Sequence, residues 1–364
     1  MASLCAVMLH DPNSCGSRSG DLARPGPAVA SLHTARPVKR AADSIAASLG
    51  ASVPQSLSVV VPTFRRPQSL ERCLRALAMQ TRLPDQIIVA CRADDEASLQ
   101  ATSRLAHEMP IHVVICDQPR LCAQMDLGVA SATGDVVALT DDDAAPTGQW
   151  AERLMRLYSE PGVGAVGGRD VISDPAVDST SSSESVGTVT RSGQPLGNHH
   201  REGLGVRDVD FLKGVNLSVR RQLWHVDLNL LGNGNQSHWE LGTCLRIRRL
   251  GWRVLYDPQL LVDHYPDARI AEPQRGSRDA YTLERDAHNQ LYELVRWLPW
   301  WQCAMATARG LIVGSRELPG PLIGVWLVTR GVRPRQALAE VQSASVGRVL
   351  AVRARPRRDR WTAP

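Results

Sequence analysis

Four short, predominantly apolar segments alternate with longer amphipathic ones between residues 57 and 140. The apolar segments are LSVVVP (57–62), QIIVAC (86–91), IHVVIC (111–116) and DVVALT (135–140). Segments of this kind are typical of strands buried on both faces, and the helices between them provide the crossovers that parallel strands need. The sequence therefore predicts an α/β domain with a mainly parallel sheet flanked by helices.

Helices are predicted between and after these strands. The spacing of apolar residues places them at 67–80, 95–109 and 120–133, and further on at 146–158, 239–251 and 280–297. One more strand is predicted at 252–258. By contrast, residues 173–207 are polar and rich in Ser and Gly, which predicts a long surface segment.

Three consecutive carboxylates, Asp141, Asp142 and Asp143, follow the fourth strand. Ligands of open α/β sheets bind beyond the carboxyl ends of the strands. Because alternate side chains of an extended segment point the same way, Asp141 and Asp143 are expected to share one divalent cation. Mg²⁺ prefers one or two carboxylates together with substrate phosphates and waters, so a metal-held diphosphate is predicted here. The alternative is an Asp-rich turn that caps the next helix.

The loop after the first strand, PTFRRPQ, contains neither G-x-G-x-x-G nor G-x-x-x-x-G-K-[ST]. These glycine-rich loops hold the phosphates of dinucleotides and of nucleoside triphosphates. Dinucleotide oxidoreductases and P-loop enzymes are therefore disfavoured, and a nucleotide held through a metal and aspartates fits better.

Composition limits the partners and the compartment. The chain has 364 residues, 43% of them hydrophobic, and a net charge of +5 that is concentrated in the tail 348–361. That tail is interpreted either as a solvated end or as a peripheral contact with an anionic membrane; it lacks the features of a nucleic-acid module. Eight cysteines without a CxxC pair indicate a reduced, cytoplasmic protein, and no segment is long enough to predict a spanning helix.

Five ordered motifs between residues 57 and 266 resemble family 2 glycosyltransferases of the GT-A fold, which act in bacterial surface polysaccharide assembly. The motifs are VVVPTFRRPQSLERCLRALAMQT, ASATGDVVALTDDDAAPTGQW, DFLKGVNLSVRR, HWELGTCLRIRRLGWRVLYDP and VDHYP. Residues 1–56 are rich in Ala, Ser, Pro and Arg without hydrophobic periodicity, which predicts a disordered leader or an over-extended start. The resemblance implies that a GT-A domain (57–270) follows. That domain has a nucleotide-sugar half (57–147) and an acceptor half (148–270). A helical region (271–345) and a basic tail (346–364) complete the chain.

The resemblance also implies roles for the carboxylates. Asp141 and Asp142 would face the donor ribose and the metal, and Asp143 would be the metal-binding end of the DxD motif. His264, in VDHYP, falls where a further metal ligand is expected, although a lone histidine is often structural. The implied cofactor is Mg²⁺ or Mn²⁺.

Glu240 takes the position of the second acid in the family's acidic pair, where Trp239 replaces the first. In an inverting transfer a single carboxylate removes the proton of the acceptor hydroxyl. Glu240 is therefore the expected catalytic base. The competing interpretation is that it only favours the start of its helix through the helix dipole.

The remaining donor-site candidates lie in three loops. They are Pro62, Thr63 and Arg65 after the first strand; Asp94 and Asp95 after the second; and Lys213 and Gly214 in KGVN. Asp94 or Asp95 would substitute for an acidic pair of the family that is absent here, since Cys91 and Arg92 stand in its place. Arg66 is equally well interpreted as a surface charge, and Lys213 as a solvated lysine beside a tight turn.

The expected function is inverting transfer of a single sugar from a nucleotide-sugar donor to a glycan or lipid-linked acceptor, at the cytoplasmic face of the cell membrane. Processive relatives carry Q-x-x-R-W, whereas the nearest string here is ELVRW at 293–297. Two alternatives remain: a nucleotidyltransferase, and a non-catalytic carbohydrate-binding protein of the same fold.

Overall fold

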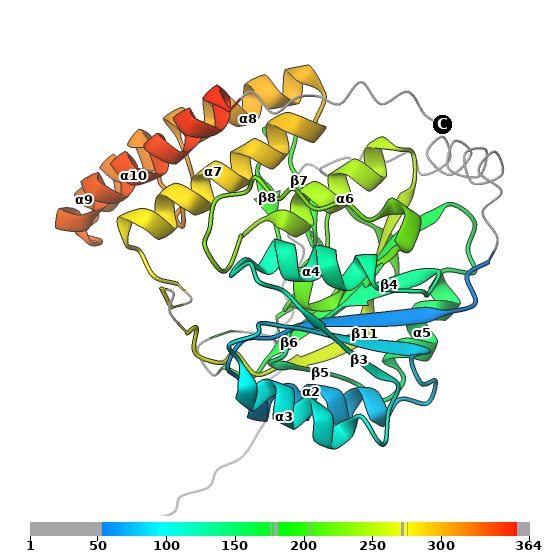
Figure 1. Cartoon of the computed structure of the whole chain (residues 1–364). Helices are drawn as coiled ribbons and strands as arrows, with labels where there is room; N and C mark the ends of the chain where they lie inside the picture. The colour runs from blue at the N-terminus through cyan, green and yellow to red at the C-terminus, as the bar shows by residue number, and fades with distance from the viewer. Residues whose placement is uncertain are drawn as a thin grey trace, which may run out of the picture. The chain divides into compact units, whose positions relative to one another are not determined.

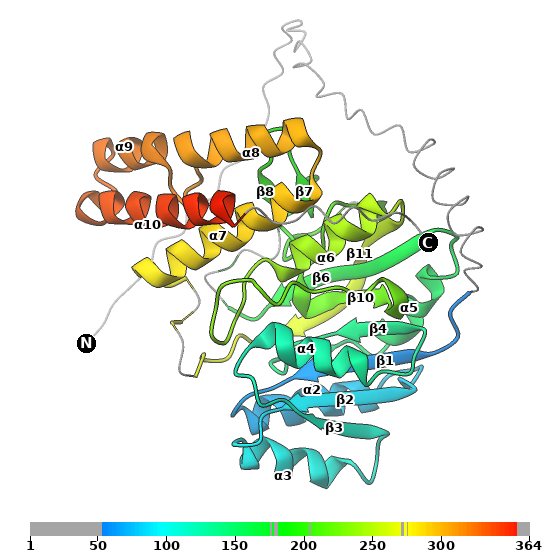
Figure 2. The ribbon, with the colours of Figure 1, turned by 45° about the horizontal axis from the view of Figure 1, so that its top comes forward.

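The structure is a computed structural model, and it describes residues 53–354 apart from 175, 176, 178–180, 204, 271, 272 and 275. Figure 1 shows the course of the chain, and Figure 2 shows it from a second direction. Most of the predicted leader (1–52) and the last part of the predicted basic tail (355–364) lie outside the described residues.

One large mixed sheet organises the described part of the chain, in the order β3-β2-β1-β4-β10-β6-β11-β5, with β9 paired to β11. The strands are β1 (Leu57–Pro62), β2 (Gln86–Cys91), β3 (Ile111–Ile115), β4 (Val136–Leu139), β5 (Ala144–Pro146), β6 (Val163–Ile172), β9 (Arg207–Asp208), β10 (Leu217–Arg220) and β11 (Arg253–His264). Strands β3, β2, β1 and β4 are parallel to one another, β10 is antiparallel to both of its neighbours, and β6 and β11 are parallel. The predicted fold class, a mainly parallel sheet flanked by helices, is confirmed.

Helices cover both faces of this sheet, as the apolar strands require. They are α2 (Pro67–Ala78), α3 (Glu96–Leu105), α4 (Leu121–Ala130), α5 (Trp150–Leu157) and α6 (Trp239–Arg249). Alternate residues of β1 belong to two different cores: Val60 packs with α4 and α6, whereas Val59 and Val61 pack with α2, α3 and α5. In Figure 1, α2 and α3 accordingly lie on the opposite side of the strands from α4 and α6.

Strand β6 was not predicted, because its sequence VGAVGGRDVI is rich in glycine. The structure explains these glycines by close packing. A Cβ at Gly164 would lie 2.7 Å from the Cβ of Trp252, and one at Gly168 would lie 2.0 Å from the carbonyl oxygen of Leu260. The glycines let the neighbouring strands and side chains approach the backbone of β6.

The segment 173–207 is only partly the surface excursion that its composition predicts. It contains the hairpin of β7 (Thr188–Val189) and β8 (Pro195–Leu196). His199 is buried, and its Nε2 atom lies 3.2 Å from the carbonyl oxygen of Phe211. The Ser/Gly-rich composition of segment 173–207 therefore did not predict the hairpin or the buried His199.

Four helices complete the described chain: α7 (Ala280–Trp297), α8 (Trp300–Ile312), α9 (Pro321–Thr329) and α10 (Pro334–Arg353). Helix α7 has the predicted bounds and packs on α6, and α10 runs along α7. The predicted basic tail therefore begins inside α10, whose last turns include residues 346–353. Among the described residues, no helix is long and apolar enough to cross a membrane.

Candidate active site

The pairing of β5 with β11 joins two parts of the chain that are far apart in sequence. After β4 ends, Asp141–Asp143 lead directly into β5, which pairs antiparallel with the end of β11 so that Ala144 lies opposite His264. The backbone N–H of Tyr265 then donates to the carbonyl oxygen of Asp143 at 2.9 Å. This register places His264 beside the aspartates.

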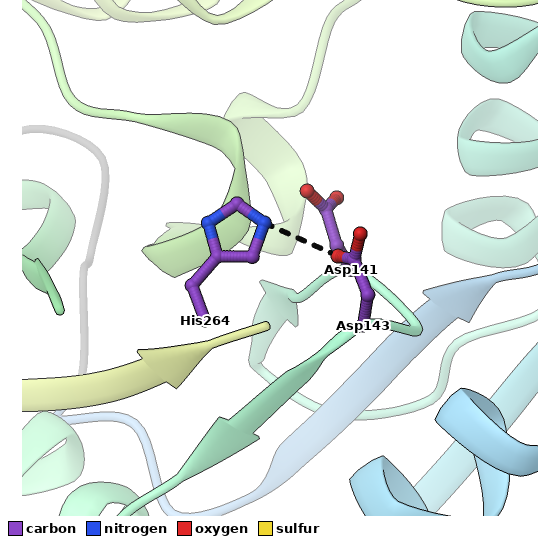
Figure 3. A group of neighbouring side chains, drawn as sticks. All are labelled: Asp141, Asp143 and His264. Carbon is purple, nitrogen blue, oxygen red and sulfur yellow. Dashed lines mark ion pairs between the residues drawn. The ribbon is translucent and has the colours of Figure 1, made fainter. Parts of the chain in front are cut away.

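Asp141, Asp143 and His264 form a compact group of candidate metal ligands (Figure 3). One ligand atom from each lies within 4.8 Å of the others, and Nε2 of His264 is 3.2 Å from Oδ1 of Asp143. Two carboxylates and one imidazole suit Mn²⁺ and also Mg²⁺ with additional oxygen ligands. The structure thus brings together the three residues predicted to hold a metal.

A second carboxylate orients His264. Oδ1 of Asp170, on β6, lies 2.9 Å from Nδ1 of His264, while its other oxygen pairs with the ammonium of Lys213. Burial opposes protonation of His264, but its hydrogen bonds to Asp143 and Asp170 outweigh this and raise its pKa to about 9. The hydrogen bond from His264 and the charge of Lys213 hold the pKa of buried Asp170 well below its usual range. The imidazole is therefore fixed with Nε2 toward Asp143.

Asp142 is hydrogen-bonded to the loop after β1 and is not one of the three candidate ligands. Its Oδ2 accepts a hydrogen bond of 2.8 Å from the Thr63 hydroxyl, and its Oδ1 accepts one of 2.9 Å from the Arg66 guanidinium. Burial, opposed by Arg66, raises the pKa of Asp142 to about 7. Its carboxylate ties the end of β4 to the loop after β1.

Arg65, expected beside the donor, and Arg66, for which a surface charge was an equal alternative, differ in the structure. Arg66 lies 2.9 Å from Asp142 and 3.5 Å from Asp143, with 16% of its side chain exposed. Arg65 has a left-handed backbone (φ 56°) and a side chain 51% exposed that pairs with Asp94. The reversed backbone at Arg65 directs it to the surface and leaves Arg66 to face the carboxylates.

The aspartates after β2 have mainly local contacts. Asp95 is buried and caps α3: one carboxylate oxygen accepts the N–H of Ser98 at 3.1 Å and the other accepts the N–H of Arg65. Asp94 pairs at the surface with Arg65 and Arg92. Arg92 stacks on Phe64, 4.2 Å from the ring centre, and it lines the cavity described next, whereas Asp94 and Asp95 do not.

A cavity of about 760 Å³ opens above these residues. Its walls include the candidates Pro62, Thr63, Asp141, Asp142, Lys213, Gly214, Glu240 and His264. They also include Arg66, Arg92, Gln124 and Asp286, which sequence reasoning did not select. Gln124, on α4, donates from its side-chain amide to the carbonyl oxygens of Thr63 and Ala90, at the ends of β1 and β2. No sequence motif links these three residues, so Gln124 could not be selected from the sequence.

Glu240 lies in the first turn of α6 and faces the cavity. Burial raises its pKa to about 7; Asp141 and Asp286 contribute to the rise, and Lys213 opposes it. A carboxylate with such a pKa can accept a proton near neutral pH. Two of the metal candidates, Asp141 and His264, and a candidate base thus line one cavity.

Residues 58–224 match the model of the protein family described as Glycosyl transferase family 2. Among curated proteins, the chain is 23% identical over 261 residues to Glycosyltransferase AglE of Haloferax volcanii, covering 66% of this chain and 79% of the relative. It is 28% identical over 222 residues to the Glucosyl-dolichyl phosphate glucuronosyltransferase of the same organism, covering 57% and 68%.

Solved structures share the fold at low sequence identity. GalNAc-T7 with UDP, GalNAc and Mn²⁺ aligns with a TM-score of 0.55 and 13% identity, over 77% of this chain and 58% of that one. S. aureus TarS 1–349 in complex with UDP aligns with a TM-score of 0.50 and 12% identity, over 82% and 92%.

Proposed function

We propose that residues 58–224, which match the Glycosyl transferase family 2 model and lie in a fold shared with solved glycosyltransferase structures, form a glycosyltransferase domain. In this proposal the chain transfers a single sugar from a nucleotide-sugar donor to a glycan or lipid-linked acceptor, with inversion. One observation carries this proposal: Asp141 and His264, two candidate metal ligands, line the same cavity as Glu240. The names of two curated relatives, a glycosyltransferase and a glucuronosyltransferase, support sugar transfer in glycoconjugate biosynthesis.

Glu240 is proposed as the general base. Its carboxylate takes the proton of an acceptor hydroxyl while that oxygen forms a bond to the anomeric carbon of the donor. The bond between this carbon and the diphosphate oxygen breaks, and the nucleoside diphosphate leaves with the electron pair. Because one displacement occurs at the anomeric carbon, its configuration inverts.

Asp141, Asp143 and His264 are the residues that would hold Mg²⁺ or Mn²⁺. A divalent cation bound there supplies the positive charge that a departing diphosphate requires. Lys213, held by Asp170, also lines the cavity and adds a fixed positive charge on the side of Glu240.

The string ELVRW supports single addition. Glu293 is buried and accepts the indole N–H of Trp297 at 3.0 Å, and Arg296 pairs with Asp227. Glu293, Arg296 and Trp297 are thus bound inside the helical packing and do not line the cavity beside Glu240. We also propose that the protein acts at the cytoplasmic face of a membrane, with peripheral contact through the predicted basic tail (346–364).

A donor screen tests the proposal. Purified protein is incubated with a panel of nucleotide sugars and with Mn²⁺, Mg²⁺ or a chelator, and thermal shift and nucleoside diphosphate release are measured. At least one donor is expected to stabilise the protein and to be slowly hydrolysed, in a metal-dependent way. If no donor binds in the presence of either metal, the proposed function is wrong.

A further inference from the structure

A second cavity, of about 590 Å³, adjoins the first. Both cavities share Lys213, Glu240 and Asp286 as wall residues. The second is bordered by α7, α8, α10 and the β7–β8 hairpin, which Figure 2 shows above the sheet. A ligand with one end at Glu240 can therefore extend into the second cavity.

Two arginines in the wall of this cavity have no acidic partner. Arg348 is 4% exposed and donates to the carbonyl oxygens of Leu318 and Pro319, and Arg309 donates to the side-chain oxygen of Gln194 at 2.6 Å. Neither forms an ion pair with any carboxylate in the described part of the chain. Burial, together with the charge of Arg309, lowers the pKa of Arg348 to about 10. Arg309 is half-buried, whereas Arg348 is a buried cation without a countercharge, which is costly and therefore uncommon.

A third guanidinium in the same wall is incompletely satisfied. Arg285 is 2% exposed, and although its Nε atom is 2.9 Å from Asp286, its Nη1 atom has no hydrogen-bond partner among the described residues. Arg278 provides the contrast, because two hydrogen bonds of 2.6 and 2.7 Å join it to Glu340. Buried donors without a partner are rare in folded proteins, so Arg285 indicates a ligand with acceptor atoms.

The rest of the second cavity has a large apolar component. Phe211, Leu241, Leu291 and Leu294 contribute to its walls. These side chains are themselves nearly buried in the core and form an apolar wall of the cavity, so an inorganic anion would satisfy the arginines and leave this wall facing water. A neutral lipid would cover the apolar side chains and leave the guanidiniums uncompensated.

We propose that the second cavity binds the phosphate or diphosphate group of an amphiphilic, lipid-linked acceptor. Arg285, Arg309 and Arg348 hold the anionic group, and the saccharide end of the same molecule reaches Glu240. Guanidinium groups are the preferred protein partners of phosphate oxygens. This inference rests on the proposed function, since it identifies the acceptor class for the same site.

Calorimetry with the full chain, without donor or metal, tests this inference. Decyl phosphate, inorganic phosphate and decanol are titrated separately, with decyl phosphate kept below its micelle concentration. Decyl phosphate is expected to bind most tightly. Arg309→Gln and Arg348→Gln are each expected to weaken that binding by about tenfold or more. Arg156→Gln, which removes an exposed charge on α5, is the control and leaves it unchanged.

Three results would overturn the inference. They are that decanol binds as tightly as decyl phosphate, that inorganic phosphate binds as tightly as decyl phosphate, or that Arg309→Gln binds decyl phosphate as wild type does. Arg309 is less buried than Arg348, so its variant serves if Arg348→Gln does not fold. Because neither donor nor metal is present, a negative result here leaves the donor screen unaffected, and failure of the donor screen leaves this binding result standing.

A separate observation concerns the outer face of α8 and α9, which lie end to end in Figure 2. Trp301, Met305 and Ile312 recur on the exposed side of α8, and Val325 and Trp326 are exposed on α9. On α8 these residues lie along one face, whereas α9 is apolar on all of its sides. Since this face is apolar in both helices, it needs a partner other than water.

The charges beside this face indicate an anionic partner. Neither α8 nor α9 contains an acidic residue. In the loop between them, Arg316 lies over the ring of Trp326 at 5.1 Å and is followed by exposed Glu317. Because Arg309 in α8 and Arg330 after α9 have no acidic neighbour in sequence, the net charge of this region is positive. Apolar helix faces with tryptophans and flanking arginines are typical of helices that lie in the surface of an anionic bilayer. If the same face of a second copy of the chain were the partner, the positive charges of both copies would lie close together and repel. We infer that the face of α8 and α9 docks on an anionic bilayer.

Sedimentation with large vesicles tests this docking. Wild type is expected to sediment with vesicles of phosphatidylcholine and phosphatidylglycerol (3:1) and much less with phosphatidylcholine alone. Met305→Glu is expected to reduce binding at least about fivefold, whereas Met79→Glu, at a more exposed position at the C-terminal end of α2, has no effect. A chain lacking residues 355–364 should retain binding.

The docking inference is wrong if Met305→Glu sediments as wild type does, or if removing residues 355–364 alone abolishes binding. It is also wrong if wild type is a dimer that Met305→Glu converts to a monomer without changing vesicle binding. In that case the apolar face is an interface between copies.

Discussion

The indole ring of Trp239 occupies the space beside Gly214 that a side chain would need. A Cβ at Gly214 would lie 2.6 Å from Cζ2 of Trp239. Gly214 begins the short 3₁₀ helix η1 (Gly214–Asn216) before β10, and Trp239 begins α6, the helix that carries Glu240. The contact therefore sets the distance between Glu240 and the loop that carries Lys213.

Gly214→Ala is expected to push Trp239 away and to shift Glu240. Because small displacements of a catalytic group are costly, kcat should fall about tenfold or more, with a fall of only a few degrees in Tm. Gly148→Ala is the matched control, since its new Cβ would meet the nearest atom at 3.6 Å, an ordinary contact. Equal kcat values for both variants would show that the Trp239 contact does not position the base.

Glu240→Gln is expected to keep metal-dependent donor binding and to lose transfer by about 100-fold or more, since an amide cannot accept the acceptor proton. Thermal shift with donor and metal measures binding, and product formation measures transfer. A fully active Glu240→Gln would remove the proposed base.

The pH profile supplies the control for this variant. The pKa of Glu240 is raised to about 7, and a base must be deprotonated. Wild-type kcat/KM is therefore expected to be constant above about pH 7 and to fall tenfold per pH unit below it. The residual activity of Glu240→Gln should lack this acidic limb.

Asp143→Ala is expected to lose metal-dependent donor binding. Changes to residues that only support a metal ligand already cost about 10- to 100-fold in metal affinity, so loss of a ligand should weaken Mn²⁺ binding by more than about 100-fold. Titration of Mn²⁺ by calorimetry measures the effect. Asp263→Asn, next to His264 but outside the group of candidate ligands, should bind Mn²⁺ as wild type does.

The sequence was sufficient to predict strands β1 to β4, part of β11 and the meeting of Asp141 with Asp143, because these follow from regular alternation along the chain. His264 could be placed only by resemblance, since the β5–β11 register that brings it beside Ala144 is a tertiary pairing. Regular patterns along the chain can be recognised in the sequence, whereas the pairing of two distant strands cannot.

Loop residues were harder to assign from sequence. Arg65 and Asp95 were expected to contact the donor. In the structure the left-handed φ of Arg65 turns its side chain to the surface, and the carboxylate of Asp95 caps α3. A residue with a left-handed backbone and a residue that caps a helix have no characteristic spacing in the sequence. From the sequence alone they therefore cannot be told apart from residues that bind a ligand. Arg66 was left undecided for the same reason.

Arg66→Gln and Arg65→Gln form a pair of neighbouring substitutions that separates these roles. Arg66 neutralises buried Asp142 and Asp143, so its loss should destabilise the metal-free protein by about 2 kcal/mol. Loss of the exposed Arg65 should change stability by less than about 0.5 kcal/mol. Added Mn²⁺ should raise Tm more in Arg66→Gln than in wild type, because the metal replaces the missing positive charge; equal Mn²⁺ shifts would contradict this.

Glu293→Gln is expected to stabilise the protein at alkaline pH. Glu293 is 2% exposed behind α6, and burial, with a smaller contribution from Glu240, raises its pKa from 4.5 to about 8. The folded state therefore binds a proton that the unfolded state has lost, so stability falls as the pH rises from about 4.5 to 8. Glutamine has a similar shape and cannot ionise, and its amide oxygen can accept the Trp297 N–H as the carboxyl does. Urea denaturation should show a gain on the order of 3 kcal/mol at pH 8.5 and almost none at pH 4.5. An equal change at both pH values would mean that Glu293 acts through packing alone.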